Sequence, residues 1–424
     1  ICDRERQIRK FVPEEFWTIT ADLLSLFPPQ FNAALIKINN KKAKIENQKQ
    51  ASGILRDLEN AQFVIHDIKS KTIKRNPAPP FITSKLQQDA INRLKFSARK
   101  TMIVAQQLYE GIEIGTGGPE GLITYMRTDS TRIASDAAEE AQKFISKTLG
   151  NEFALSKPRF FKNKNKVQDA HEAIRPTSVF NSPKMLKKFL SPDQFNLYTL
   201  IWNRFVASQM TQSIIDQKTI LIQATDQYLF SVSGSTVRFP GFMKLYSQDQ
   251  ESKEKEIQVL PDAKIGTALK TLKINPKQHF TKPLPRFSEA SLVKELEKNG
   301  IGRPSTYASI LTVIRDKGYV DLIKRYFIPS ELGFIVNDLL AASFPNILNI
   351  SFTAQLETNL DDVETGNLEE VQLLTNFYAT FKQSLDAASE NMVSVKGVGV
   401  DTDLKCPSCK KQLNIKIGKN GHFL

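Results

Sequence analysis

The sequence contains few cysteine residues, and this scarcity excludes one class of protein. Only 3 cysteines occur among 424 residues, which is too few for the disulfide framework of a small secreted domain. The chain opens on Ile1 and the charged run from Asp3 to Arg6, and it shows no apolar signal-peptide core. A reducing compartment is therefore indicated, and we expect the protein in the cytoplasm.

Long apolar segments are also lacking. The longest stretch without a charged residue runs from Leu339 to Leu356, and Pro345, Asn346 and Asn349 interrupt it. A bilayer-spanning helix needs about 20 mostly apolar residues. We therefore expect no membrane-spanning segment.

Positive charge is in excess. Lys and Arg number 58 against 45 Asp and Glu, which leaves a net charge of +13. Such an excess favours a polyanionic partner, with nucleic acid as the first choice and an anionic membrane surface as the second. The length predicts roughly three domains.

The texture of the sequence changes three times along the chain. Residues 20–84 and 212–281 are β-like, whereas residues 85–211 are mainly helical. The simplest interpretation is a helical domain inserted into a β-rich domain, although sequence alone does not show that the two β-like blocks pair. Helices return from Ser288 to about residue 395, with a β-like interruption at Tyr326–Ile328.

Local signals place several boundaries. Ser84 and Gln87 predict a capping box for a helix over about 85–96, and Ser191 with Gln194 predicts a second one. The run Ser233 to Thr236 has the composition of a tight hairpin turn.

The most informative segment reads Gly117-Gly118-Pro119-Glu120-Gly121-Leu122-Ile123-Thr124-Tyr125-Met126-Arg127-Thr128-Asp129-Ser130-Thr131-Arg132. If this run is extended, Tyr125, Arg127 and Asp129 point to the same side. A phenol is a poor nucleophile unless a neighbouring cation or base helps it to lose its proton. Arg127 could do this or hold a phosphate; the alternative is a core tyrosine beside a surface arginine.

A second segment, Asp169-Ala170-His171-Glu172-Ala173-Ile174-Arg175-Pro176, contains one of only 4 histidines. Histidine can donate or accept a proton near neutral pH, and with arginine it suits a phosphate undergoing substitution. The alternative is a surface helix end with an ion pair between Glu172 and Arg175.

A third segment, residues 287–310, predicts a helix-turn-helix. Ser288 caps the first helix, Asn299-Gly300 ends it, and Pro304 begins a second helix that buries Ile310, Val313 and Ile314. Free backbone N–H groups at that start, with Arg303, Ser305 and Thr306, would suit a DNA phosphate. Ordinary capping with a solvated Arg303 is the alternative.

Two further segments contain candidate metal ligands. Residues 353–364 form an acidic helix whose carboxylates could orient an arginine network, hold a metal or simply face solvent. Cys406 and Cys409 have the knuckle spacing of a zinc ribbon, but they supply only two of four ligands, and His422 is a weak substitute. Cys2 is expected to be a buried structural thiol.

Taken together, in this order and spacing, these motifs resemble the type IA DNA topoisomerases, and Met126 within Thr-Tyr-Met-Arg-Thr-Asp-Ser is similar to the bacterial topoisomerase I branch. The resemblance covers nearly the whole chain. It implies a multidomain α+β padlock: a helical base at 1–19 and 282–400, a β-rich arch at 20–84 and 212–281, a helical nucleophile domain at 85–211, and a truncated zinc ribbon at 401–424.

The resemblance also implies roles for individual residues. Tyr125 would attack single-stranded DNA and form a 5′-phosphotyrosine without ATP, Arg127 would steady the scissile phosphate, and His171 would hydrogen-bond it. Four further positions would line the DNA path: Arg175, Arg303, Thr306 and Lys317. A cytoplasmic, nucleoid-associated monomer that binds DNA and no membrane is expected.

In this family an amino-terminal Toprim domain holds Mg2+ and would precede Ile1. We therefore expect a fragment cut at both ends that binds single-stranded DNA but cleaves it poorly, with Zn2+ held only partially by Cys406 and Cys409. Two other interpretations remain: a non-catalytic single-stranded DNA-binding module, and a tyrosine recombinase, which would leave a 3′ linkage and arrange its arginines differently.

Overall fold

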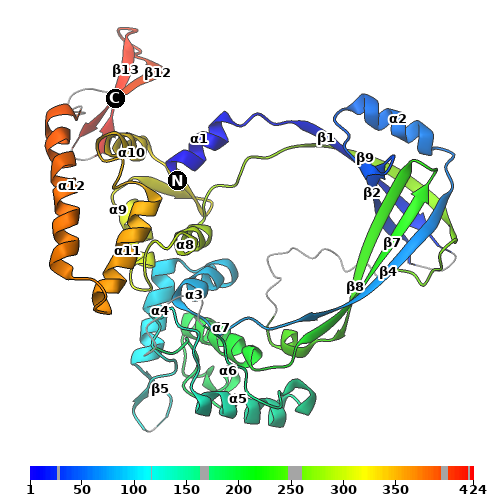
Figure 1. The fold of residues 1–424 in the computed structure, drawn as a ribbon, viewed down its shortest axis with the longest axis horizontal. Coiled ribbons are helices and arrows are strands. Elements are labelled where there is room, and N and C mark those ends of the chain that lie inside the picture. The colour runs from blue at the N-terminus through cyan, green and yellow to red at the C-terminus, as the bar shows by residue number, and fades with distance from the viewer. Residues whose placement is uncertain (26–28, 116, 163–170, 247–259, 393–399, 419–420) are drawn as a thin grey trace. The chain divides into compact units, whose positions relative to one another are not determined.

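The computed structural model describes all residues except 26–28, 116, 163–170, 247–259, 393–399 and 419–420. The chain, coloured by residue number in Figure 1, divides into two compact units. One unit comprises residues 7–96 and 100–284, and the other comprises residues 1–6, 97–99 and 285–424. Within the described ranges, no helix is both long and apolar enough to cross a membrane.

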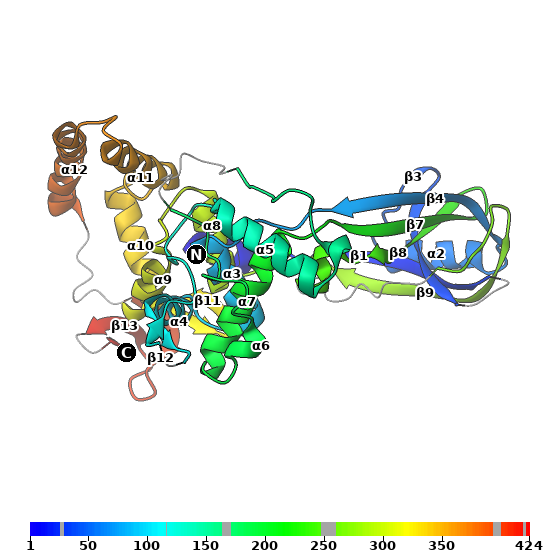
Figure 2. The same cartoon turned by 90° about the horizontal axis from the view of Figure 1, so that it is seen from below.

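A seven-stranded antiparallel sheet dominates the first unit. Its order is β1-β9-β4-β7-β8-β2-β3, and because β1 also pairs with β2 the sheet closes on itself. The strands are β1 (Glu15–Leu24), β2 (Phe31–Ile38), β3 (Lys41–Lys42), β4 (Phe63–Arg75), β7 (Ser213–Ala224), β8 (Tyr228–Phe239) and β9 (Ala268–Phe280). The two β-like blocks of the sequence therefore pair: β4 runs beside β7 from Phe63↔Ala224 to Arg75↔Ser213, as Figure 2 shows.

Helix α2 (Gln48–Leu58) covers one face of this sheet. Its Ala51, Ile54 and Leu58 are buried at a helical spacing against alternate strand residues. The shared core contains Ile19, Leu23, Phe31, Phe63, Ile65, Ile220, Ile222 and Phe230. Alternation of apolar and polar residues thus fixes which face of each strand turns inward.

The helical part of the first unit is inserted between β4 and β7, as predicted. It contains α3 (Thr83–Asp89), a π-helical turn η1 (Ala90–Leu94), most of α4 (Ala98–Glu110), α5 (Ser135–Thr148), α6 (Pro183–Leu186) and α7 (Pro192–Ser208). The predicted capping box of Ser191 and Gln194 is confirmed. Tyr198 and Phe205 of α7 are fully buried in the core of this part.

Two local predictions in this unit are wrong. Helix α3 begins at Thr83 after Ile82, so Ser84 lies inside the helix, where its buried hydroxyl has no hydrogen-bond partner in the described structure. The tertiary contacts of Thr83 override the capping signal. The run from Ser233 to Thr236 lies within β8, and the turn falls instead at Thr225, whose φ of 58° is left-handed.

The second unit is mainly helical, with two small sheets. Its helices are part of α1 (Cys2–Lys10), α8 (Glu289–Lys298), α9 (Tyr307–Asp316), α10 (Glu331–Ser343), α11 (Ile350–Glu364) and α12 (Glu370–Asn391). Its strands are β10 (Val320–Ile323), β11 (Tyr326–Pro329), β12 (Val400–Lys405), β13 (Gln412–Gly418) and β14 (Gly421–Phe423). The predicted β-like interruption is confirmed as β11, and the predicted cap of α8 at Ser288 is confirmed.

Helix α9 differs from its prediction. It begins at Tyr307 instead of Pro304, because the hydroxyl of Thr306 and the carbonyl of Arg303 close a tight turn before it. Leu311 is buried, whereas Val313 is 47% exposed. The apolar face is therefore rotated from the one that the sequence indicated.

A buried ion pair anchors the start of the chain within the second unit. Glu5 is only 4% exposed, and both of its carboxylate oxygens accept from the Arg286 guanidinium, at 2.7 and 2.9 Å. Cys2 is half-buried, and its thiol contacts the Gly333 carbonyl at 3.8 Å. The α+β class is confirmed, while β1 begins at Glu15, within the segment assigned above to the base.

Candidate active site

The segment from Gly121 to Arg132 is irregular, with bends at Thr124, Met126 and Arg127. Its side chains nevertheless alternate in exposure: Tyr125, Arg127 and Asp129 are exposed, and the residue after each of them is buried, namely Met126, Thr128 and Ser130. The buried set fixes the segment in the helical core. The exposed set presents a phenol, a guanidinium and a carboxylate on one side of the backbone.

One edge of this segment is held by the start of α3. Thr83 donates from its hydroxyl to the Met126 carbonyl at 2.7 Å and accepts from the Thr128 N–H at 2.9 Å. The backbone N–H of Thr83 donates to the Thr128 carbonyl at 2.9 Å. Thr83 is completely buried, so this single side chain bridges both sides of the backbone around Arg127.

The other edge is held by residues 173–177. The Thr124 N–H donates to the Arg175 carbonyl at 2.9 Å, and the Thr124 hydroxyl donates to the Ala173 carbonyl at 2.7 Å. The Thr177 N–H donates to the Leu122 carbonyl at 3.0 Å. Backbone hydrogen bonds therefore flank Tyr125 on both sides, and its position does not depend on its own side chain.

Two aromatic rings flank the Tyr125 ring. Tyr109, near the end of α4, lies 5.4 Å away in an edge-to-face arrangement, and His171 lies 6.0 Å away on a tilted plane. The Tyr125 side chain remains 38% exposed. The structure thus brings the predicted nucleophile and the predicted histidine together, although they are 46 positions apart in the sequence.

The arginines of the site are of two kinds. Arg175 forms a 2.8 Å ion pair with Glu172, also donates to the Pro176 carbonyl, and its side chain is only 13% exposed. The predicted pair therefore exists, but in irregular backbone instead of a helix end. Arg127 is exposed, and no described residue pairs with its guanidinium. Asp169, in the same predicted constellation as His171, lies outside the described residues.

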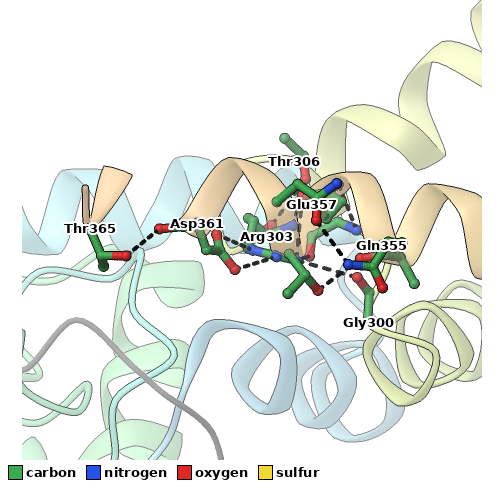
Figure 3. A network of polar contacts seen from close by, with 11 residues as sticks. Gly300, Arg303, Thr306, Gln355, Glu357, Asp361 and Thr365 are labelled. Carbon is green, nitrogen blue, oxygen red and sulfur yellow. Dashed lines mark hydrogen bonds and ion pairs between the residues drawn. The ribbon is translucent and has the colours of Figure 1, made fainter. Parts of the chain in front are cut away.

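A second candidate site lies in the turn between α8 and α9, shown in Figure 3. Arg303 does not face solvent: it forms a forked pair with Asp361 of α11, at 3.2 and 2.6 Å, and an ion pair with Glu357 at 3.3 Å. The predicted free N–H groups at the helix start are wrong for Thr306 and Tyr307, because both donate to the Arg303 carbonyl, at 2.9 and 3.3 Å. In the same turn, Glu357 of α11 accepts from the Gly302 N–H.

The charge of Arg303 is reinforced by these partners. Partial burial acts against the charged form, but the hydrogen bonds that Arg303 donates to Asp361 and the charges of Asp361 and Glu357 outweigh it and raise the pKa of Arg303. Of the alternatives left open for the acidic helix, Glu357 and Asp361 show orientation of an arginine, while Asp361 and Glu364 also face solvent. Lys317, which follows α9, is exposed and has no ion-pair partner in the described part of the chain.

The cysteine knuckle has the local geometry of a metal-binding turn. The Cys406 N–H donates to the Lys411 carbonyl at 2.8 Å, and the Lys410 N–H donates back to the Cys406 carbonyl at 2.9 Å. Hydrogen bonds from the backbones of Cys409 and Ser408 lower the pKa of the Cys406 thiol. A thiolate is the form that binds zinc, so these residues fit half of a tetrahedral site. The side chain of His422 is outside what the structure describes.

The two half-buried thiols should differ in alkylation. Hydrogen bonds lower the pKa of Cys406, whereas burial raises the pKa of Cys2. As pH rises, the Cys406 thiolate therefore appears first, and iodoacetamide should modify Cys406 at lower pH than Cys2. Peptide mass spectrometry after short pulses at several pH values measures this order. Equal modification profiles would contradict it.

Sequence reasoning missed two residues of this site. Thr83 carries no motif, and its partners lie 43 and 45 positions away. Tyr109 lies outside every segment that the sequence singled out. Among the described residues, no cluster of three or more His, Cys, Asp or Glu side chains could hold a metal ion.

Comparison with known proteins defines the class. Residues 1–375 match the model of a family described as DNA topoisomerase, and the chain belongs to that family. It is 43% identical over its whole length to DNA topoisomerase 1 of Rickettsia bellii and to that of Rickettsia prowazekii. Full-length topoisomerase I of Thermotoga maritima has a similar structure, with a TM-score of 0.83 and 36% identity over the whole chain.

The relatives are longer than this chain. It spans 55% of the Rickettsia bellii protein, 57% of the Rickettsia prowazekii protein and 66% of the Thermotoga chain. The activity of the whole relative is therefore considered below as a proposal.

Proposed function

We propose that this chain is the strand-cleaving part of a type IA topoisomerase, which relaxes negatively supercoiled DNA without ATP. The observation that carries the proposal is Tyr125: an exposed phenol flanked by His171, beside a guanidinium without a described partner, on a backbone segment locked along both edges. A nucleophile held in place by its surroundings saves the entropy of positioning. Membership in the DNA topoisomerase family supports the assignment.

In the proposed reaction, the Tyr125 Oη attacks the phosphorus of a single-stranded phosphodiester and the bond from phosphorus to the 3′ oxygen breaks. The phenol gives up its proton, the leaving 3′ oxygen gains one, and the 5′ phosphate stays bound to Tyr125. Arg127 would neutralise the charge that develops on the phosphate, and His171 would donate a hydrogen bond to it. Reversal of these steps after strand passage restores the DNA, so no ATP is needed.

The other predicted DNA-binding residues would hold the DNA strand. Lys317 and the turn that contains Arg303 and Thr306 would bind the DNA backbone within the second unit. Arg175 would act near Tyr125; its Nε and Nη2 donate to Glu172, and its Nη1 donates to the Pro176 carbonyl. We also propose a monomer in the cytoplasm, associated with the nucleoid.

The proposal includes two metal ions, Zn2+ and Mg2+, and residues 1–424 would provide ligands only for Zn2+. Cys406 and Cys409 would supply two of four ligands to a structural Zn2+ ion, with the other two outside the described residues. Mg2+ would be held by a Toprim domain that is not part of residues 1–424, and this chain alone would cleave DNA poorly. When present, that domain would supply the acidic magnesium site.

The experiment is a cleavage assay with two labels. The chain, supplemented with Mg2+ and a Toprim-containing fragment of a relative, is incubated with single-stranded oligonucleotides labelled at either the 5′ or the 3′ end, and then quenched with denaturant. We expect the 3′-end label to become protein-bound, because the fragment downstream of the break carries the 5′ phosphate. A protein-bound 5′-end label would support a recombinase-type linkage, and tight binding without an adduct would support a DNA-binding module.

A further inference from the structure

The turn between α8 and α9 is fastened to α11 through one side chain. All three guanidinium nitrogens of Arg303 are engaged: Nε and Nη2 with Asp361, and Nη1 with the Gly302 carbonyl at 3.0 Å and with Glu357. The Arg303 side chain is 29% exposed. Figure 3 shows these contacts, which connect Arg303 of the turn to Glu357 and Asp361 of α11.

The acidic residues also hold the backbone of the turn. Glu357 accepts from the Gly302 N–H at 3.1 Å through one oxygen, while its other oxygen pairs with Arg303. Gly302 has a φ of 81°, and a side chain there would lie 3.0 Å from the Tyr307 ring. Glycine adopts this φ readily, whereas the nearby ring leaves no room for a side chain, so the turn requires glycine at position 302.

Thr306 completes the turn from inside. Its hydroxyl accepts from the Arg303 N–H at 2.8 Å, and its own N–H donates to the Arg303 carbonyl at 2.9 Å. Ser305 is exposed and lies between the two residues that these hydrogen bonds join, at the tip of the turn. The position of the tip, and of any group that binds there, therefore depends on how Arg303 is held.

We propose that Glu357 and Asp361 are positioning residues that clamp Arg303, and that Arg303 shapes the DNA-binding turn without itself binding a phosphate. The inference rests on the proposed function, because it assumes that a strand lies along this turn. Two carboxylates already neutralise the guanidinium and occupy its fork. A phosphate would have to displace both, and a forked arginine–carboxylate pair is among the stronger contacts at a protein surface.

The alternative is a competitive switch, in which Arg303 pairs with the carboxylates in the absence of DNA and exchanges them for a phosphate when DNA binds. The two ideas make opposite predictions for one substitution. In the clamp, Asp361→Asn loosens the turn and weakens DNA binding. In the switch, the same change frees Arg303 and tightens binding.

The test measures binding of fluorescein-labelled oligothymidylate to the 424-residue chain across a range of salt concentrations. We expect Arg303→Ala and Asp361→Asn each to weaken binding by about 10- to 100-fold, the range of a charge-assisted hydrogen bond. The double variant should be no weaker than Arg303→Ala alone, because both changes break one clamp. The slope of log Kd against log salt should stay the same.

Two further variants sharpen the result. Arg303→Lys keeps the charge but cannot form the fork, so the clamp requires it to bind as weakly as Arg303→Ala. Asp362→Asn removes the same charge one residue away, at a side chain with no contact to Arg303, and should leave affinity unchanged. Together these variants separate clamping from general electrostatics.

Three outcomes would overturn the clamp: tighter binding by Asp361→Asn, full binding by Arg303→Lys, or a salt slope that falls by about 0.7 in Arg303→Ala, the value for one lost phosphate contact to a single strand. If the wild-type chain does not bind the oligonucleotide, the proposed function fails. The clamp is then judged by melting temperature, where Arg303→Ala and Asp361→Asn must lower it non-additively and Asp362→Asn must not.

Discussion

Tyr125→Phe is expected to abolish the covalent protein–DNA adduct while changing affinity for single-stranded DNA by no more than about twofold. The substitution removes only the phenolic oxygen. Leu122, Thr124 and Thr128 hold the surrounding segment through their backbones, and the ring contacts with Tyr109 and His171 can persist. The loss would therefore be chemical and not structural. Denaturing gels of the supplemented chain with end-labelled DNA measure it.

Tyr109→Phe is the matched control for this prediction. Tyr109 lies beside Tyr125 with a similar exposure, 40% against 38%, and it loses the same atom. It should retain the adduct, whereas an adduct that survives in Tyr125→Phe and disappears in Tyr109→Phe would reassign the nucleophile. Loss in both variants with unchanged folding would mean that the two hydroxyls act together.

Thr83→Val is expected to lower both stability and cleavage. The Thr83 hydroxyl donates to Met126 and accepts from Thr128, and valine can do neither. Two buried backbone groups lose their partner, which should cost about 2 to 4 kcal/mol of unfolding free energy. Because the same bonds set the position of Tyr125, adduct formation should fall by about 100-fold even where the protein is folded.

Thr83→Ser distinguishes the hydroxyl from the shape of the side chain. Serine keeps the donor and the acceptor, so stability and cleavage should stay near those of the wild type. Denaturant unfolding gives the free energies, and adduct yield at a temperature where both variants are folded gives the cleavage. A cleavage loss in Thr83→Val without a stability loss would show that the segment is held by its other edge.

The sequence was informative wherever the signal was local. Caps at Ser191 and Ser288 stand where their motifs predicted, because a capping box involves residues only three positions apart. The exposure of Tyr125, Arg127 and Asp129 at every second position was also predicted, although the backbone there is bent and not strand-like. The motif order identified the family, and the family match agrees.

Local signals failed where distant residues compete with them. Ser84 satisfies the rule for a helix cap, but Thr83 makes tertiary bonds to Met126 and Thr128, and the helix begins at Thr83, two residues earlier than predicted. Ser233 to Thr236 has turn composition, but the partner strand β7 extends across it. In both cases the sum of long-range hydrogen bonds outweighs a preference of about 1 kcal/mol.

By itself, the sequence determined the class of fold, the identity of the candidate nucleophile and the charge of the surfaces, because each depends on residue type and short spacing. The tertiary structure decided whether Arg303 is available. The pair of Arg175 with Glu172, three positions away, was already among the alternatives that the sequence offered, whereas the pair of Arg303 with Asp361 was not. Pairing of charges depends on which carboxylate the fold brings near, and for Arg303 that carboxylate lies 58 positions away.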